Sequence, residues 1–199
     1  KLQRADAAAV LELDLGELAS EVALGDSVLV DGVCLTARSL NSPSVVFDVS
    51  SETLRLTTLG SLRRGAKVNV ELAMRPRDRF GGHFVSGHID GTGQIADITR
   101  RPGETRISFS AKPELTDCMI MKGSVAVSGI SLTVAALSRG KFEVSLIPHT
   151  LDGTNLSLKK PGDPVNIECD MIGKFVRRFV ENSENGSKLS MEKLRENGF

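Results

Sequence analysis

Val28–Thr36 reads VLVDGVCLT, and Val125–Thr133, 97 positions later, reads VAVSGISLT. In both copies an apolar strand runs into an Asp-Gly or Ser-Gly turn and then resumes with a β-branched residue. A two-residue turn ending in glycine joins antiparallel strands well, because its backbone twist matches theirs. Alternate residues of a strand share one face. The sequence therefore predicts two equivalent hairpins, each with a small polar pair just after the turn: Cys34 with Thr36, and Ser131 with Thr133.

The repeat extends over most of the chain. Thr53-Leu54 returns as Thr150-Leu151, and VNVE at residues 68–71 returns as VNIE at residues 165–168. A period near 97 residues is too long for a solenoid unit and favours a duplicated small domain of short strands, typical of a closed barrel. Periodicity predicts strands over 9–15, 45–49, 68–72, 106–111 and 142–145. It also predicts helical turns over 17–22 and 114–119, and a short helix that Ser51 caps.

One segment of the second copy has no counterpart in the first. Ser86–Ile95 resembles an opening strand with a bend that glycine permits. Shifted back by 97 positions, it falls before residue 1, and the sequence starts with Lys1 rather than Met. We therefore expect roughly a dozen preceding residues, enough to form the first strand of the first barrel.

The composition changes after Asp170. Ile172, Phe175, Val176, Phe179 and Val180 are spaced as one apolar stripe of a helix. Gly186 interrupts this pattern, and Leu189–Leu194 offers another turn or two. The stripe can either cap its own barrel or form a contact between subunits.

Composition excludes several classes of function. The chain has 25 basic and 25 acidic residues, so its formal net charge of zero offers no field that attracts nucleic acid or an anionic membrane. It contains no Trp or Tyr, which argues against an aromatic cage for a base or a cation. No apolar run reaches the roughly 18 residues that span a bilayer. Three cysteines at unpatterned spacings indicate free thiols and a cytoplasmic protein.

Several polar residues are candidates for chemistry. The segment GGHFVSGH at residues 81–88 carries two histidines among glycines, and His83 is expected to be structural whereas His88 is the functional candidate. Zinc needs three or four ligands at recognisable spacing, and no second cluster provides them, so no metal is expected. Cys34 is either a nucleophile or an inert buried thiol. The polar residues around 48–53 and 149–150 are either solvated strand ends or hydrogen-bonding groups for a ligand. The pattern predicts two pockets for a neutral, hydrogen-bonding ligand.

As a set, the motifs resemble those of the riboflavin synthase alpha-chain family over about residues 8–180: GVCLT with GISLT, GGHFVSGHIDGTG, SETL at 51–54 and IPHTL at 147–151. The resemblance implies two tandem six-stranded Greek-key β-barrels, an N-terminal lumazine-binding barrel over 1–83 and a C-terminal one over 84–171. Residues 172–199 then form a helix for oligomerisation and a tail. The implied assembly is a homotrimer whose sites lie between the N-terminal barrel of one subunit and the C-terminal barrel of its neighbour.

The implied reaction is a transfer of four carbons between two molecules of 6,7-dimethyl-8-ribityllumazine, giving riboflavin and 5-amino-6-(D-ribitylamino)uracil without cofactor or metal. The alternative is a non-catalytic lumazine- or flavin-binding protein of the same fold. The resemblance also implies site residues. The first pocket takes Cys34, Leu35, Thr36, Asp48, Val49, Ser50, Ser51, Glu52, Thr53, Gly87, His88 and Ile89. The second takes Lys122, Ser131, Leu132, Thr133, Ser145, Leu146, Ile147, Pro148, His149 and Thr150.

The residues implied to be catalytic are Cys34, His88, Ser131 and Asp170. His88 and Ser131 are the candidates for proton handling, and Cys34 for polar or transient nucleophilic help. The family also has a Met-Phe-Thr-Gly-type opening segment that contributes to the first pocket. The sequence from Lys1 does not contain this segment, so the first site is expected to be incomplete without it.

Overall fold

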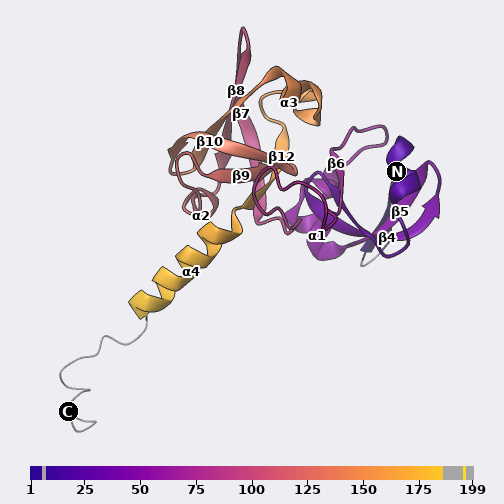
Figure 1. Ribbon diagram of the computed structural model, residues 1–199, viewed down its shortest axis with the longest axis horizontal. Coiled ribbons are helices and arrows are strands. Elements are labelled where there is room, and N and C mark those ends of the chain that lie inside the picture. Colours follow the sequence, from indigo (N-terminus) through magenta and orange to yellow (C-terminus); the bar gives the residue numbers. More distant parts are fainter. Residues whose placement is uncertain (6–7, 186–194, 196–199) are drawn as a thin grey trace.

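The computed structural model describes residues 1–5, 8–185 and 195, which form two six-stranded antiparallel sheets and a long C-terminal helix (Figure 1). The first sheet has the order β1-β2-β5-β4-β3-β6. Its strands are β1 (Leu2–Ala5), β2 (Ala8–Asp14), β3 (Ser27–Val30), β4 (Val33–Asn41), β5 (Ser44–Ser50) and β6 (Val70–Leu72). The second sheet is a closed barrel of order β10-β11-β8-β7-β12-β9. Its strands are β7 (Gly91–Arg101), β8 (Glu104–Ala111), β9 (Ser124–Val127), β10 (Ile130–Ser138), β11 (Lys141–Leu146) and β12 (Pro164–Cys169).

Both sheets have Greek-key connections. In the second, β9, β10 and β11 follow one another as neighbours, and β8 lies beside β11. The first sheet repeats this arrangement with β3, β4 and β5, and with β2 beside β5. The turn residues Asp31 and Ser128 have φ values of 46° and 47°, and each precedes a glycine of positive φ, as the tight hairpins require. The all-β, duplicated fold class predicted from the sequence is confirmed.

The two sheets differ at their first strands. Strand β7 pairs with both β8 and β12 and so closes the second barrel. Strand β1 pairs with β2, and β6 pairs with β3, so within the described residues these two strands are the edges of the first sheet. The periodicity did not predict β1. The strand expected from Ser86 begins only at Gly91, because the preceding residues are held by the hydrogen bonds described below.

Short helices connect the strands: η1 (Gly16–Glu21), α1 (Ser51–Leu56), η2 (Thr58–Ser61), α2 (Pro113–Thr116), α3 (Pro148–Asp152) and η3 (Asn155–Leu158). The cap predicted at Ser51 is wrong by one residue. The hydroxyl of Ser50 accepts a hydrogen bond from the backbone N–H of Thr53, at 3.1 Å. Ser50 is the last residue of β5 and still extended, so its side chain faces the first turn of α1 as an N-cap requires.

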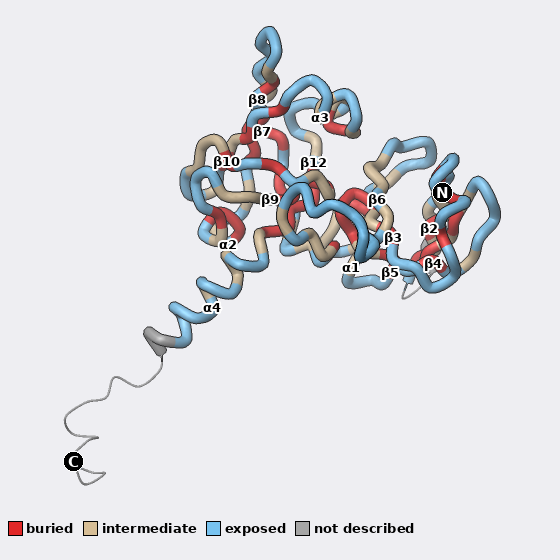
Figure 2. The backbone as a smooth tube through the Cα atoms, viewed as in Figure 1, coloured by how far each residue is buried: buried red, intermediate tan, exposed pale blue. Residues whose placement is uncertain are grey.

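Each half buries its own core, along the strands that Figure 2 marks as buried. Phe47 is fully buried in the first core. In the second, Phe109 and Phe142 stack with ring centroids 4.9 Å apart. Leu59 and Leu156, 97 positions apart, are also fully buried, one in each core. Each half therefore has its own apolar source of stability.

The halves meet at their hairpin turns. Gly32 lies so close to Gly129 that a Cβ on Gly32 would be 2.5 Å from the backbone nitrogen of Gly129. Two asparagines at equivalent positions bridge the turns reciprocally. Asn69 Nδ2 donates to the carbonyl oxygen of Ser128 at 2.9 Å, and Asn166 Nδ2 donates to that of Asp31 at 2.8 Å. The joint is thus a self-complementary contact of the kind found between the subunits of a twofold dimer.

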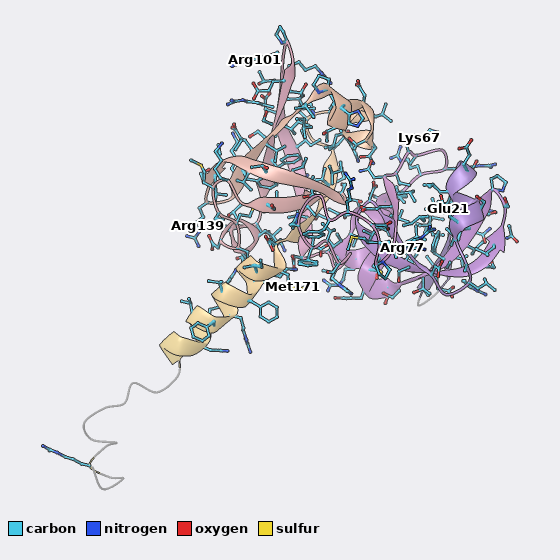
Figure 3. The ribbon with its side chains drawn as sticks, in the orientation of Figure 1. Glu21, Lys67, Arg77, Arg101, Arg139 and Met171 are labelled. Atoms are coloured by element: carbon cyan, nitrogen blue, oxygen red, sulfur yellow. The ribbon has the colours of Figure 1, made fainter. Side chains whose placement is uncertain are left out.

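Helix α4 (Met171–Asn185) leaves the second barrel at Met171 and projects away from both sheets (Figures 1 and 3). Its first turns are anchored by an ion pair between Lys174 and Asp90 at 2.7 Å and by a hydrogen bond from Arg177 Nη1 to the carbonyl oxygen of Glu114. The predicted apolar stripe is present and exposed: Ile172, Phe175, Val176, Phe179 and Val180. The chain's own barrel therefore does not cover it. The further turn predicted over Leu189–Leu194 lies outside the described residues.

No helix within the described ranges is long and apolar enough to cross a membrane.

Candidate functional site

Each sheet carries a small polar face on its outer side. Ala37 of β4 lies opposite Phe47 of β5 and both are buried, so the adjacent Thr36 and Asp48 point outward and are exposed. The corresponding residues of the second barrel are placed in the same way. We call these the first polar face (Cys34, Thr36, Asp48 and Ser50) and the second polar face (Ser131, Thr133 and Ser145). They match the polar pairs predicted from the repeated turn.

Four of the predicted pocket residues point inward instead. Leu35 and Val49 belong to the first core, and Leu132 and Leu146 to the second, none more than 8% exposed. They alternate with the polar residues along the same strands, so their side chains lie on the opposite face of the sheet. A ligand on either polar face can reach only their backbone.

Ion pairs and short helices border the polar faces. Asp48 pairs with Arg38 at 2.7 Å, and Glu52 pairs with Arg55, whose hydrogen bond lowers the pKa of the Glu52 carboxyl. Beside the second face, the hydroxyl of Ser145 donates to Glu104 at 2.7 Å. The other predicted residues of these borders are exposed or half-buried: Ser51, Thr53, Lys122, Ile147, Pro148, His149 and Thr150. Lys122 has a φ of 65°, and its N–H donates to the carbonyl oxygen of Val134.

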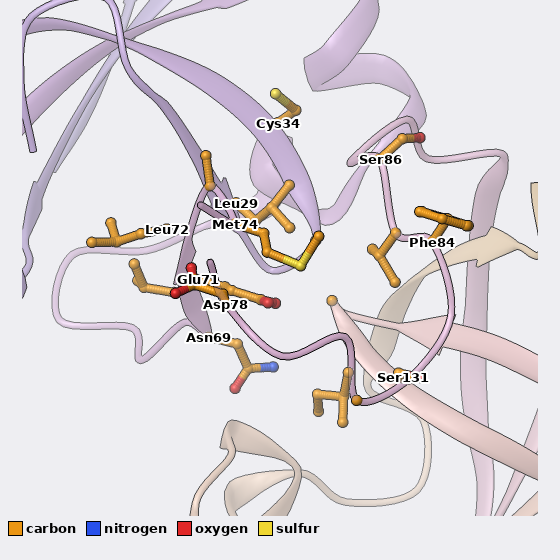
Figure 4. Close-up of a pocket in the computed structure, with 18 of the residues that line it drawn as sticks. Leu29, Cys34, Asn69, Glu71, Leu72, Met74, Asp78, Phe84, Ser86 and Ser131 are labelled. Carbon is orange, nitrogen blue, oxygen red and sulfur yellow. The ribbon is translucent and has the colours of Figure 1, made fainter. Parts of the chain in front are cut away.

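A cavity of about 1070 Å³ lies between the two halves and contains one residue of each polar face. Figure 4 shows Cys34 and Ser131 on opposite sides of it, with Phe84 and Ser86 on the linker that runs from one towards the other. Residues 73–90, which we call the linker, join β6 to β7 and supply much of the cavity lining. The structure therefore brings the two repeated motifs to one shared space.

The linker first touches the second polar face. His83 Nδ1 lies 2.8 Å from Ser131 Oγ, and a Cβ on Gly82 would lie 2.8 Å from the same oxygen. Burial lowers the pKa of His83, while the nearby carboxylates of Asp170 and Glu168 act to raise it. His83 was expected to be structural, and no sequence pattern indicated that it would meet Ser131.

Four residues later the linker reaches the first polar face. The carbonyl oxygen of Gly87 accepts a hydrogen bond from Cys34 N–H at 2.9 Å, and Gly87 has a φ of +81°. A Cβ on Gly87 would lie 2.5 Å from the Cβ of Cys34, so only glycine fits here. His88 follows at once and is exposed, and Ile89 packs against the first core. Of the predicted group Gly87-His88-Ile89, it is thus Gly87 that contacts Cys34 directly, and a shared role of these residues in a pocket stays a prediction.

A buried carboxylate holds this part of the linker. Glu168 of β12 accepts hydrogen bonds from Ser86 N–H at 2.8 Å, from Ser86 O–H at 2.7 Å and from Gly87 N–H at 3.0 Å. Ser86 Oγ in turn lies 3.0 Å from His88 Nδ1. Sequence analysis did not select Glu168, although its place in the repeated VNVE and VNIE segments was a usable signal. This residue sets the position of the linker beside both polar faces.

The chain is similar to known proteins over nearly its whole length. A family model described as "Lumazine binding domain" matches it twice, at residues 3–73 and 86–170. The riboflavin synthase of Actinobacillus pleuropneumoniae is 45% identical over 96% of this chain and 90% of that protein. The riboflavin synthase of Bacillus subtilis (strain 168) is 42% identical over 100% of this chain and 94% of that protein. This chain belongs to the riboflavin synthase family.

A solved structure agrees with the fold of this family member. LumP complexed with 6,7-dimethyl-8-(1'-D-ribityl) lumazine superimposes with a TM-score of 0.77 over 85% of this chain and 92% of that chain. The two sequences are 22% identical, so this similarity supports the fold alone.

Two further acidic residues, Asp170 and Glu71, lie close to the site. Asp170 accepts a hydrogen bond from Ile172 N–H at 3.0 Å and so begins α4. Glu71, the first-copy equivalent of Glu168, lines the cavity. Its carboxylate has no hydrogen-bond partner among the described residues, and burial raises its pKa. The catalytic role expected for Asp170 stays a prediction. Within the described part of the chain, no group of three or more His, Cys, Asp or Glu side chains could hold a metal ion.

Proposed function

We infer that this protein catalyses the riboflavin synthase reaction. Two molecules of 6,7-dimethyl-8-ribityllumazine would react, one giving four carbons to the other, to yield riboflavin and 5-amino-6-(D-ribitylamino)uracil. The observation that carries this inference is the pair of matched polar faces in a chain 45% identical to a riboflavin synthase. Two equivalent faces suit two identical substrate molecules. Their hydroxyl, thiol and carboxylate groups suit a ligand with amide-like ring edges and a ribityl chain.

The proposed reaction requires no strong base among the side chains. A methyl group on the lumazine ring is acidic, because its carbanion delocalises into the ring system, so a modest base is sufficient. General acid–base assistance typically contributes about 10²–10⁴-fold. Holding the two rings in reacting geometry contributes up to roughly 7–11 kcal/mol in favourable cases. We therefore assign most of the rate enhancement to positioning. Ser131 and His88 are the candidates for proton transfer, and Cys34 is the candidate for contact with the acceptor ring.

The direct test adds the lumazine to the purified protein and follows riboflavin by its absorbance and fluorescence. We expect about one riboflavin for every two lumazines consumed, the ratio that the proposed transfer between two bound molecules requires. A non-catalytic lumazine- or flavin-binding protein would instead bind the compound and leave its concentration unchanged. The second result would overturn the proposed reaction.

We also propose a homotrimer assembled through α4. The exposed fractions of Ile172, Phe175 and Val176 are 66%, 70% and 58%, although the three side chains lie on one stripe. Burying one such side chain contributes about 1.5–3 kcal/mol, so three helices meeting along these stripes would supply a stable contact. In this assembly a complete site forms between the first polar face of one subunit and the second polar face of its neighbour.

Mixing two inactive variants tests the site between subunits. Thr36→Arg blocks the first polar face and Thr133→Arg blocks the second, and both positions are exposed, so each variant should fold. If sites form between subunits, a trimer reassembled from equal amounts of both variants contains about a quarter of its sites with two intact faces. Activity should then return on mixing. Sites built within one chain would give no recovery, because every chain would carry one blocked face.

Finally, we propose that the enzyme works in the cytoplasm. Its three cysteines are free: Cys34 and Cys118 are half-buried and Cys169 is buried. Free thiols persist in a reducing compartment. The formal net charge of zero supports a small-molecule substrate rather than nucleic acid. Fractionating the cells that produce the protein, and measuring the redox state of Cys118 by thiol labelling, checks this location.

A further inference from the structure

Two of the three cysteines lie together where α4 leaves the second barrel. Cys118 Sγ donates a hydrogen bond to the carbonyl oxygen of Glu114 at 3.4 Å, and Cys169 Sγ donates to that of the next residue, Leu115, at 3.5 Å. The two thiols are also in hydrogen-bonding contact with each other. Sulfurs that meet in this way satisfy the first requirement for a disulfide.

The two sulfurs have different surroundings. Cys169 is 2% exposed, and burial, followed by the charge of Asp90, raises its pKa to about 12, so it remains a protonated thiol at neutral pH. Cys118 is half-buried, and its Sγ accepts a hydrogen bond from Arg177 Nη1 at 3.2 Å. Positive charge beside a sulfur favours the thiolate, which is the form that reacts with oxidants. Cys118 is therefore the reactive member of the pair and Cys169 the protected one.

The contacts that anchor α4 also involve this pair. Arg177 holds the helix to the barrel partly through Cys118 Sγ. Asp90, which pairs with Lys174 at 2.7 Å, also accepts a hydrogen bond from Cys169 N–H at 2.8 Å. A change at either sulfur therefore acts on the first turns of α4.

The pair belongs to the half of the chain that carries α4. Shifted back by 97 positions, Cys118 corresponds to Glu21 and Cys169 to Leu72. The first core is built without sulfur at these places, so packing of the repeated fold does not require the two cysteines. Their presence coincides with the helix that follows the second copy.

We propose that Cys118 and Cys169 form a redox-sensitive pair that hydroperoxides convert into a reversible disulfide, and that this disulfide releases Arg177 and loosens the hold of the second barrel on α4. A disulfide sulfur carries no charge and is directed at its partner, so Arg177 loses the acceptor that Cys118 provides. Disulfides in a reducing compartment are usually transient and redox-sensing, in agreement with the cytoplasmic location proposed above.

The reaction with hydrogen peroxide balances in two steps. The Cys118 sulfur attacks one peroxide oxygen, the O–O bond breaks, and a sulfenic acid and one water form. The Cys169 sulfur then attacks the sulfenic sulfur, the S–O bond breaks, and the oxygen leaves as a second water with the proton of the Cys169 thiol. The two thiols together lose two electrons and two protons, and the peroxide is reduced to two waters.

Peptide mapping of the whole protein tests the disulfide. The reduced protein is exposed to hydrogen peroxide, its remaining thiols are blocked by alkylation, and its peptides are analysed by mass spectrometry. We expect a link between the peptides that contain Cys118 and Cys169, and its complete removal by dithiothreitol. No such link at peroxide concentrations that oxidise Cys34 would overturn the proposal.

Arg177→Gln and Arg178→Gln form a matched pair of variants. Glutamine at position 177 keeps an amide donor but loses the charge, so disulfide formation should slow by about tenfold. Arg178 is the exposed neighbour on the same helix, and its substitution should leave the rate unchanged. Equal rates in the two variants would overturn the role assigned to Arg177.

Amide hydrogen exchange measures the effect on α4. Exchange over residues 172–177 should be about threefold faster or more in the oxidised than in the reduced protein. In Cys169→Ala, which cannot form the link, peroxide should leave this exchange unchanged. An unchanged rate in the wild type after the disulfide has formed would overturn the coupling to α4. Riboflavin formation is not a readout here, so these results are separate from the test of the proposed reaction.

Discussion

Asp31 is a buried, ionisable residue at the joint between the halves, whereas the equivalent residue of the second copy cannot carry a charge. The side chain of Asp31 is 3% exposed at the joint between the halves, and its Oδ1 accepts hydrogen bonds from Asn69 N–H and Asn155 Nδ2, each at 2.8 Å. Burial raises its pKa more than these bonds and the charge of Lys159 lower it. The equivalent residue in the second copy is the uncharged Ser128, so the joint does not need a carboxylate.

Asp31→Asn should therefore stabilise the protein at neutral pH. Because the folded-state pKa of Asp31 is raised, the stability it contributes is fully present below its unfolded pKa of about 3.8 and is lost as pH rises through the folded pKa. Asparagine keeps the accepting oxygen, carries no charge and tolerates the positive φ of 46°. We expect Tm at pH 7 to rise by about 2–4 °C, with the difference vanishing below pH 3.8.

Calorimetry from pH 3 to 8 measures this difference, and Asp31→Ala, which removes the accepting oxygen, is the matched control that should lower Tm. A lower Tm for Asp31→Asn at pH 7 would show that the carboxylate charge stabilises the joint.

Single residues were predictable from the sequence where strand alternation decides their direction. Alternation paired Cys34 with Thr36, and Ser131 with Thr133, because a strand fixes the face of every second residue. His83 was not, because it lies on the irregular linker, where no period relates sequence to direction. Its partner Ser131 is 48 residues away, and only the folded chain brings the two together.

At the scale of elements, the two hairpin turns carry the contact between the halves. Gly32 and Gly129 both have positive φ, and each lies against the backbone of the other. Gly65 also has positive φ, at +83°, but a Cβ there would have nothing within 4 Å. Comparing Gly32 with Gly65 separates backbone strain from the contact.

Gly32→Ala should destabilise the protein more than Gly65→Ala does. The conformational strain common to both is about 1–2 kcal/mol. Only Gly32→Ala adds a clash, with its new Cβ 2.5 Å from Gly129 N, so the turns must separate and the reciprocal asparagine bonds must lengthen. Urea unfolding should show a larger loss for Gly32→Ala, together with faster proteolysis of the linker. Equal losses in the two variants would mean that the turns move apart at no cost.

Elements were predicted well where hydrophobic alternation is strong, as in β2, β5, β8 and β11. Ser86–Asp90 was predicted as the start of a strand and is not one. The backbone amides of Ser86 and Gly87 bond a buried carboxylate instead of a neighbouring strand. These hydrogen bonds depend on Glu168, which is more than 80 positions away, so no local sequence pattern predicts them.

At the scale of the whole molecule, α4 is the part that a single chain leaves without cover. Phe175→Asp with Val176→Asp should convert the proposed trimer into monomers with folded barrels, because both side chains are exposed and belong to neither core. If sites form between subunits, the monomers should make little riboflavin, and activity should rise steeply with protein concentration. Arg178→Ser, an exposed change on the same helix, is the control and should keep both assembly and activity.

Sedimentation and turnover, measured at the same protein concentrations, test whether loss of the trimer and loss of activity go together. Monomers that keep full turnover when dilute would contradict sites between subunits.

The duplication and the two cores could be inferred from the repeat alone. The joint between the halves could not, since Asn69 and Asn166 reach turns at sequence separations of 59 and 135 residues. Repeats predict equivalent units, but the contact between the units depends on how their surfaces meet.

The linker also limits how this chain can change over generations. It meets Ser131 at His83 and Cys34 at Gly87, so a spacing of four residues spans both contacts. A residue inserted between these two points would pull one of them off its partner, whatever its chemistry. Insertions and deletions between them should therefore be tolerated less well than substitutions. Among related chains, this stretch should hold its length as well as its GGHFVSGH motif, unlike most surface loops.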